Sequence, residues 1–123
     1  DCIRNFPSAM SFLKSFLIGK NPTIIAKNNI VAPVSVDWCA GCLIGFSMIH
    51  YRQLDGFDER YFMYCEDIDI CYRSCKIHGK RVVYFPDIKA VHLSQRRSKR
   101  FLSKHFYWHV ISAIKFIIRR QFH

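Results

Sequence analysis

Hydrophobic residues recur at helical spacing in three parts of the chain. This pattern predicts helices over residues 8–18, 66–78 and 105–120. Gly19 and Gly79 stand directly after the first two segments, and glycine commonly ends a helix because it adopts positive φ without strain. Helices therefore account for both ends of the chain and for its centre.

The segments between these helices favour strands and turns. A continuous apolar run over residues 42–49 is long enough for a buried strand, and the β-branched and aromatic residues 81–85 predict another. Residues 88–93 are a third candidate. The Asp-Gly pair at 55–56 predicts a chain reversal, and the Pro- and Asn-containing stretch 21–33 predicts an irregular surface loop of the kind that often covers a ligand.

The C-terminal part differs in character from the rest. Residues 94–104 form a basic, polar linker, and the helix after it is amphipathic. Its predicted apolar face contains Phe106, Val110, Ala113, Ile114 and Ile117, and its predicted polar face contains His105, His109, Ser112, Lys115 and Arg119. We therefore divide the chain into residues 1–93, a globular part, and residues 94–123, a basic linker with an amphipathic helix that can associate with a membrane surface.

Charge narrows the choice of partners. The 123 residues carry a formal charge of +10, and none of the acidic residues lies after Asp87. A hydrophobic content of 50% excludes a disordered chain and allows one domain or part of one. An acid-free basic segment attracts phosphate groups, whether they belong to nucleic acid, a nucleotide or anionic lipid.

The N-terminal residues lack the pattern of a secretory signal, and no apolar run reaches the length of a membrane span. We therefore expect the six cysteines to be reduced thiols in the cytosol. Four of them have spacing that a tetrahedral zinc site can use, namely Cys39, Cys42, Cys71 and Cys75. Their apolar surroundings favour the simpler interpretation of small buried hydrophobes.

The acidic residues are concentrated at and before the start of the predicted central helix. Five of the nine acidic residues fall between Asp58 and Asp69, in a chain that is otherwise basic. An aromatic run, Tyr61, Phe62 and Tyr64, leads into the last three of them. Glu66 and Asp67 occupy the predicted first turn, where carboxylates are stabilised by backbone N–H groups, so helix capping is the plain interpretation. Asp69 is placed to pair with Arg73 one turn later. Because residues two apart point in different directions on a helix, we do not assign Asp67 and Asp69 to one metal ion.

These residues resemble the C-terminal part of family 2 glycosyltransferases with the GT-A fold, and among them bacterial O-antigen rhamnosyltransferases. The specific motif is Phe-Met-Tyr-Cys-Glu-Asp-Ile-Asp-Ile-Cys at residues 62–71. Shorter matches are Arg-Asn-Phe-Pro at 4–7, Val-Asp-Trp-Cys-Ala-Gly at 36–41, Gly-Phe-Asp at 56–58 and Val-His at 91–92. The resemblance implies an α/β fold, the acceptor-side part of a GT-A domain, with a short mixed sheet, flanking helices and an amphipathic C-terminal helix.

The resemblance also implies roles for individual residues. Asp67, within the Glu66–Asp67 pair, is the expected catalytic base of an inverting sugar transfer, and His92 is an expected metal ligand. Asp37, Trp38 and Gly41 match the segment that lines the donor and acceptor clefts. Residue pattern alone favours a structural role for a lone histidine such as His92.

The implied reaction moves a sugar, rhamnose by resemblance, from a nucleotide-diphosphate donor to a lipid-linked saccharide in lipopolysaccharide O-antigen synthesis. It implies a divalent metal, Mg²⁺ or Mn²⁺, with further ligands outside this chain, and a location at the cytoplasmic face of the inner membrane, with no nucleic-acid partner. The family's N-terminal donor-binding half is missing from these residues, so we expect little activity from them alone. The alternative is a non-enzymatic basic domain that binds membrane or nucleic acid, with zinc at the four cysteines.

Overall fold

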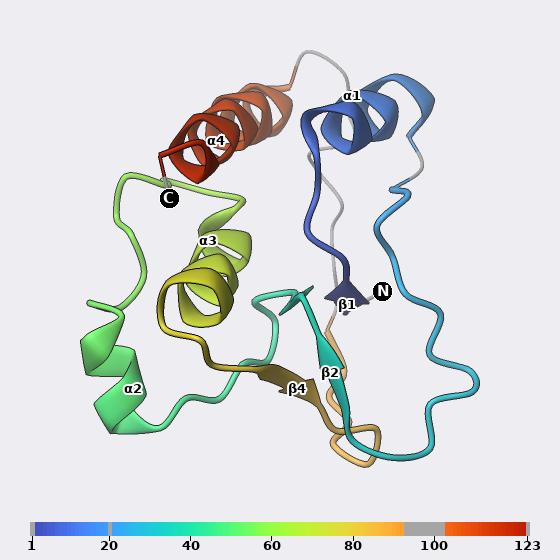
Figure 1. The fold of residues 1–123 in the computed structure, drawn as a ribbon. Helices are drawn as coiled ribbons and strands as arrows, with labels where there is room; N and C mark the ends of the chain where they lie inside the picture. Colours follow the sequence, from blue (N-terminus) through green and yellow to red (C-terminus); the bar gives the residue numbers. More distant parts are fainter. Residues whose placement is uncertain (1, 20, 93–102, 123) are drawn as a thin grey trace.

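The computed structural model describes residues 2–19, 21–92 and 103–122. Its elements follow one another along the chain as shown in Figure 1. They are β1 (Ile3–Arg4), α1 (Ala9–Ile18), β2 (Val34–Val36), β3 (Trp38–Cys39), α2 (Met48–Gln53), α3 (Glu66–Tyr72), the π-helical turn η1 (Arg73–Ile77), β4 (Val82–Tyr84) and α4 (Lys104–Arg120).

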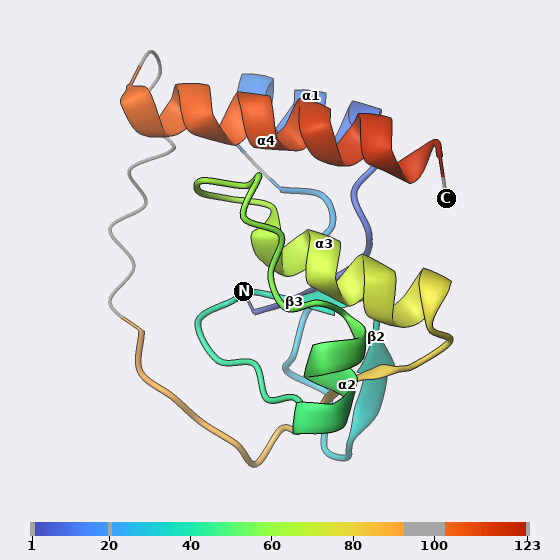
Figure 2. The same cartoon turned by 90° about the vertical axis from the view of Figure 1, so that its left-hand side faces the viewer.

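The helices are arranged in layers around α3. Helices α1 and α4 lie side by side on one side of the molecule, and α3 lies directly beneath α4 (Figures 1 and 2). Ring contacts between Phe12 and Phe116 and between Phe16 and Phe106 join the two outer helices. Helix α2 and the strand pair β2–β4 lie on the far side of α3. The N-terminus of α3, with its acidic residues, is therefore covered by one helical layer.

The strands form two small antiparallel pairs, in place of the single mixed sheet that was expected. Strand β1 pairs with β3, with Ile3 opposite Cys39, and Arg4 also forms a bridge to Ile24. Strand β2 pairs with β4, with Ser35 opposite Val83. The α/β character is as predicted, and residues 34–39 run on from β2 into β3, so this segment takes part in both pairs.

The predicted helices are confirmed with small shifts at their ends. Helix α1 begins after Ser8, whose side chain accepts a hydrogen bond from Ser11 N, and ends at Gly19 with φ +70°. The central helix continues from α3 into η1, so that helical structure covers residues 66–77, and Gly79 follows it with φ +61°. The strand predicted over 81–85 is β4.

The predicted reversal at 55–56 is confirmed, because Asp55 and Gly56 both have positive φ. The loop prediction for 21–33 is confirmed over the residues that the structure describes, where regular pairing is limited to the bridge at Ile24.

Two strand predictions are wrong. Residues 42–46 are irregular and Met48 begins α2, because Ser47 caps that helix by accepting a hydrogen bond from His50 N at 3.2 Å. Leu43, Met48 and Ile49 of this run are exposed, and Ile44 and Phe46 are only partly buried against the core, so a buried strand was the wrong inference from hydrophobicity. Residues 88–92 form no strand and expose Val91; Leu93 lies outside the described residues. The predicted linker is also outside them up to residue 102, and Ser103 is the N-cap of α4.

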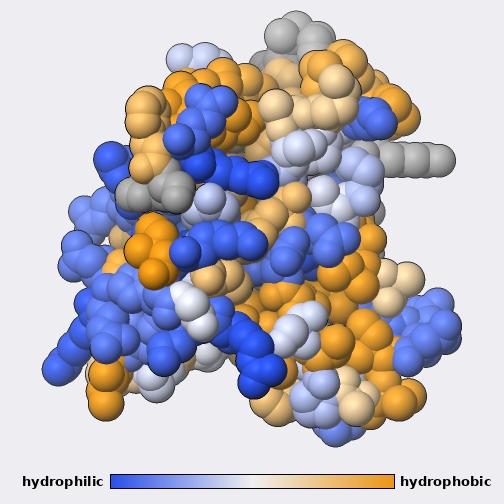
Figure 3. Space-filling view, viewed as in Figure 1, coloured by the Kyte–Doolittle hydropathy of each residue, from blue (hydrophilic) through white to orange (hydrophobic). Residues whose placement is uncertain are grey.

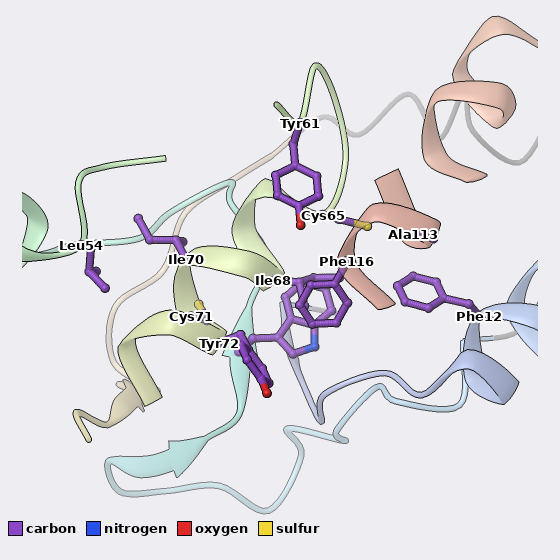
Figure 4. Packing of buried hydrophobic residues seen from close by; sticks show 11 residues of the cluster. Phe12, Leu54, Tyr61, Cys65, Ile68, Ile70, Cys71, Tyr72, Ala113 and Phe116 are labelled. Atoms are coloured by element: carbon purple, nitrogen blue, oxygen red, sulfur yellow. The ribbon is translucent and has the colours of Figure 1, made fainter. Parts of the chain in front are cut away.

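Helix α4 completes the core. Phe116 is buried between Phe12 of α1 and Tyr72 of α3, with ring centroids 6.5 and 5.7 Å away (Figure 4). Burial of one such side chain contributes about 2–3 kcal/mol to folding. The buried face of α4 contains Ser112, Ala113 and Phe116, whereas Ile114, predicted on the apolar face, is half exposed. The buried face is therefore rotated toward residues predicted to be polar.

The polar residues of α4 hold the loop that leads to α3. Five side chains of α4 contact this loop: Arg119 pairs with Asp58, Lys115 Nζ donates to Arg60 O, Ser112 Oγ donates to Met63 O, the ring of Trp108 meets Phe62, and His105 Nδ1 bonds Tyr64 Oη. We call these five contacts the α4–loop contacts. They explain why the polar face turns inward.

A buried ion pair anchors α3. Asp69 Oδ2 accepts a hydrogen bond from Arg73 Nε at 2.7 Å, as the one-turn spacing predicted. The Arg73 guanidinium also donates to the carbonyl oxygens of Leu54 and Gly56 at the end of α2. Both side chains of the pair are almost fully buried. None of the helices in the described part of the chain has the length and apolar character to cross a membrane.

We predict that Arg73→Met lowers the free energy of unfolding by about 3–5 kcal/mol, because it leaves the Asp69 carboxylate buried without its main partner. Urea denaturation followed by tryptophan fluorescence measures this. Arg60→Met is the matched control, since Arg60 pairs with Asp58 at the surface, with 71% of its side chain exposed. Similar losses of stability in the two variants would contradict the anchoring role of the buried pair.

Candidate active site

The backbone reverses sharply just before the acidic motif. Tyr64 and Cys65 have φ values of +69° and +66°, and Cys65 is the N-cap residue of α3. Non-glycine residues rarely adopt this conformation, which costs on the order of 1 kcal/mol or more per residue. The α4–loop contacts hold Tyr64 from one side, and the buried Cys65 side chain holds the other. Glu66 and Asp67 therefore enter the helix at a fixed angle.

Asp67 is anchored across the molecule to the segment after β3. Its Oδ2 accepts a hydrogen bond from Gly41 N at 2.9 Å, and its Oδ1 accepts one from Ile68 N at 2.9 Å. Gly41 is exposed, so this contact lies at the surface. A Cβ atom on residue 41 would stand 3.4 Å from Asp67 Cβ and 3.7 Å from Oδ2, which are ordinary van der Waals distances. The Gly41 backbone therefore lies close against the Asp67 side chain.

The surroundings of Asp67 favour proton uptake. Burial raises the pKa of the Asp67 carboxyl, and the hydrogen bonds from Gly41 and Ile68 and the charge of Arg4 limit the rise. Burial also raises the pKa of Glu66, and the charge of Asp67 raises it further. Glu66 Oε2 is buried with no hydrogen-bond partner among the described residues. Two adjacent carboxyls with raised proton affinity form a site that can accept a proton from a bound hydroxyl.

Asp37 and Trp38 build the wall next to Gly41. Asp37 Oδ2 accepts a hydrogen bond from Phe6 N at 2.7 Å, and Trp38 Nε1 donates to Asn5 O at 2.9 Å. The Trp38 side chain is buried, with the Arg4 guanidinium 5.0 Å from its ring centroid. Both residues thus fix the path of the chain from β1 and β3 to Gly41. Their predicted contact with substrate stays a prediction.

The structure does not bring His92 to these residues. His92 is exposed, and none of the contacts found in the described part of the chain joins it to Asp67. Asp67 and Asp69 point to different partners, Gly41 and Arg73, as the helix geometry predicted. No group of three or more His, Cys, Asp or Glu side chains within residues 2–19, 21–92 and 103–122 is placed to hold a metal. These residues alone therefore do not fit a divalent metal site.

The same finding bears on the four cysteines. Cys42 Sγ donates weakly to Ala40 O, and Cys75 Sγ to Asp37 O. Cys71 is buried beside Cys39. Among the described residues the four sulfurs do not converge, so the zinc alternative has no geometric support.

Comparison with known proteins places these features in a family context. The rhamnosyltransferase WbbL of Escherichia coli K12 is 39% identical over 119 residues, which is 97% of this chain and 45% of that protein. The chain is similar to bacterial rhamnosyltransferases. An N-acetylglucosaminyl-diphospho-decaprenol L-rhamnosyltransferase of Mycobacterium tuberculosis is 34% identical over 86 residues, 70% of this chain and 28% of that protein.

The chain thus spans less than half the length of the rhamnosyltransferases that it resembles. No protein-family model matches the sequence, and no solved structure gives a significant match. The similarity to rhamnosyltransferases agrees with the resemblance carried by the 62–71 motif.

Sequence reasoning missed two parts of this site. One is Arg4, whose charge acts on Asp67 from β1. The other is the set of α4 side chains that hold the loop before α3, His105 and Ser112 among them. Their spacing along one helical face was visible, but it suggested a solvent-facing surface. One signal was available in the sequence. The polar face of this helix includes uncharged hydrogen-bonding residues, and these can bind the loop that carries the acidic motif.

His109 gives a test of how α4 is attached to this loop. Its ring lies 4.8 Å from that of Tyr64 and 5.0 Å from that of Phe16, and burial, with the Arg4 charge nearby, lowers its pKa to about 4. Below its ordinary value of 6.5, the unfolded histidine binds a proton that the folded one does not. We therefore predict that stability falls as pH is lowered from about 6.5 toward about 4.

Urea unfolding at several pH values measures this slope. In His109→Phe the slope should shrink by up to one proton, because no histidine is left to titrate at this position. His78→Phe, which removes an exposed histidine from another part of the chain, is the control for the substitution itself. An unchanged slope in His109→Phe would contradict a buried neutral imidazole.

Proposed function

We propose that this chain is the acceptor-side part of an inverting rhamnosyltransferase. The observation that carries the proposal is the Asp67 carboxylate, which is held at an exposed edge by Gly41 and has a raised proton affinity. The similarity to WbbL and to the mycobacterial enzyme supports rhamnose as the sugar that is moved. A raised pKa, a fixed carboxylate and a position beside the exposed Gly41 are the properties expected of a general base.

In the proposed reaction, Asp67 takes the proton of an acceptor hydroxyl. The acceptor oxygen forms a bond to the anomeric carbon of the donor while the bond to the nucleoside diphosphate breaks, and that group leaves from the opposite face. The anomeric configuration is inverted as a result. The Gly41 N–H keeps the carboxylate pointed at the hydroxyl before and after proton transfer. Glu66, with its unpartnered Oε2, is the second carboxyl of the site and accepts a hydrogen bond from the acceptor.

We assign the acceptor to the class of lipid-linked saccharides. The name of the mycobacterial relative describes an acceptor in which a sugar is joined through diphosphate to decaprenol, a polyprenol lipid. By analogy, the acceptor here is a lipid-linked glycan of O-antigen synthesis, met at the cytoplasmic face of the membrane. Asp37, Trp38 and Gly41 border the place where its sugar binds, with Asp37 and Trp38 acting mainly by shaping the backbone.

The nucleotide-diphosphate donor is assigned to residues outside this chain, in keeping with the small share of the relatives that it covers. We make the same assignment for most ligands of a divalent metal, Mg²⁺ or Mn²⁺, since the residues described here do not form a metal site. His92 contributes one nitrogen ligand in this proposal. Nucleic acid is not among the proposed partners.

The proposal predicts that Asp67→Asn, placed in a longer protein that includes the donor-binding residues, lowers rhamnose transfer by about 10²–10⁴-fold, the usual contribution of a general base. Product formation is measured by mass spectrometry of the glycan. Glu59→Gln removes an exposed carboxylate from the same acidic stretch and should keep normal turnover.

The side-chain amide of the Asp67→Asn variant has a single acceptor oxygen where the carboxylate has two, and each carboxylate oxygen accepts one backbone hydrogen bond. The circular dichroism and unfolding midpoint of the variant must therefore be measured alongside its activity. Near-normal turnover of a folded Asp67→Asn protein would exclude Asp67 as the base. A product that retains the donor's anomeric configuration, determined by NMR, would exclude inversion.

A further inference from the structure

The outer layer of the molecule exposes apolar side chains from two helices that are far apart in the sequence. In α1, exposed apolar residues follow one helical stripe: Met10, Leu13 and Leu17. In α4 and directly after it, a second stripe contains Tyr107, Ile114, Ile118 and Phe122. Apolar surface gathers over both helices along the upper edge of the space-filling view (Figure 3). We call this surface the α1–α4 face.

The charges on the two helices have one sign. Neither α1 nor α4 contains an Asp or Glu, and Lys14, Lys104 and Lys115 are exposed on them. An exposed apolar stripe bordered only by cations is typical of helices that lie in the interface of an anionic bilayer.

We propose that the α1–α4 face docks on the surface of an anionic lipid bilayer. The side chains of the two stripes enter the boundary between headgroups and acyl chains, and Lys14 and Lys104 bind lipid phosphates. The proposal rests on the proposed function in one respect: a lipid-linked acceptor explains why this chain would meet a bilayer. The docking surface itself is argued from the exposed residues.

This orientation suits the candidate site. A different side of α4 makes the α4–loop contacts, and α3 lies directly beneath α4 (Figure 2). Docking therefore covers neither Gly41 nor Asp67, and it leaves the carboxylate one helical layer from the lipid. In this orientation the acceptor hydroxyl approaches Asp67 while its lipid stays in the bilayer.

The face extends beyond the C-terminal segment that the sequence suggested. The charge asymmetry pointed to residues after Asp87, whereas α1 contributes a full stripe of the exposed apolar surface. Ring contacts of Phe12 with Phe116 and of Phe16 with Phe106 hold α1 against α4, so the two stripes form one rigid surface. Removal of α4 alone would also disrupt the core, which makes point variants the better test.

The test uses the whole 123-residue chain and sedimentation with sucrose-loaded vesicles of phosphatidylcholine and phosphatidylglycerol. The triple variant Leu17→Glu, Ile114→Glu, Ile118→Glu places charges on the face. The control variant Val31→Glu, Ile49→Glu, Phe85→Glu makes the same charge change at exposed apolar residues elsewhere. We expect at least about tenfold weaker vesicle binding for the face variant and binding close to that of the wild type for the control. Wild-type binding should weaken with added salt and on pure phosphatidylcholine.

Equal binding by the two variants would overturn the proposal, because net charge alone would then explain the association. It would also be overturned if the wild-type chain did not bind vesicles but sedimented as a dimer that the face variant dissociates, since a second copy would then cover the face. No donor or acceptor sugar is used, so the result is separate from the assignment of Asp67. Asp67→Asn should bind vesicles like the wild type even where it abolishes transfer.

Discussion

The buried Asp69 carboxylate connects the parts of this molecule. Arg73 binds one of its oxygens, and Tyr61 and Arg119 approach the other at 3.4 Å. Through Arg73 the same pair holds the carbonyls at the end of α2. One ion pair therefore links α2, α3, the acidic loop and α4. Because a buried charge is tolerated only with its partners in place, this arrangement allows little variation in the position of α3.

The position of Asp67 depends on the ion pair that holds α3. Asp67 lies two residues before Asp69 and points the other way, toward Gly41 at the exposed edge. The two carboxylates of the motif thus have separate partners: Asp69 binds Arg73 in the core, and Asp67 accepts a hydrogen bond from Gly41 at the surface. Two successive residues with positive φ precede them, and the α4–loop contacts keep that strained turn in place. Strain is concentrated where the proposed reaction takes place, as is common at functional sites.

Local features were predictable from the sequence, and features that depend on distant contacts were not. The Asp69–Arg73 pair was predicted because residues one turn apart face each other, and the end of α1 was predicted from Gly19. The Gly41–Asp67 contact joins residues 26 positions apart, so no local pattern contains it; only the family resemblance placed both residues in one site. The strand predicted over 42–49 was wrong because a helix cap at Ser47 outweighed hydrophobicity. The prediction of which face of α4 is buried was wrong because polar residues of α4 form hydrogen bonds with a loop more than 40 residues earlier in the sequence.

The central claim is that Asp67 is a proton acceptor with raised affinity, held by the Gly41 amide. NMR titration of the ¹³C-labelled Asp side-chain carboxyls, together with the Gly41 amide proton, measures this directly on the 123-residue chain. We predict that the Asp67 carboxyl titrates above the ordinary value of 3.8, and that the Gly41 amide shift follows the same curve because it donates to that carboxyl. An Asp67 pKa at or below 3.8, or a Gly41 amide that does not respond to the titration, would contradict the account.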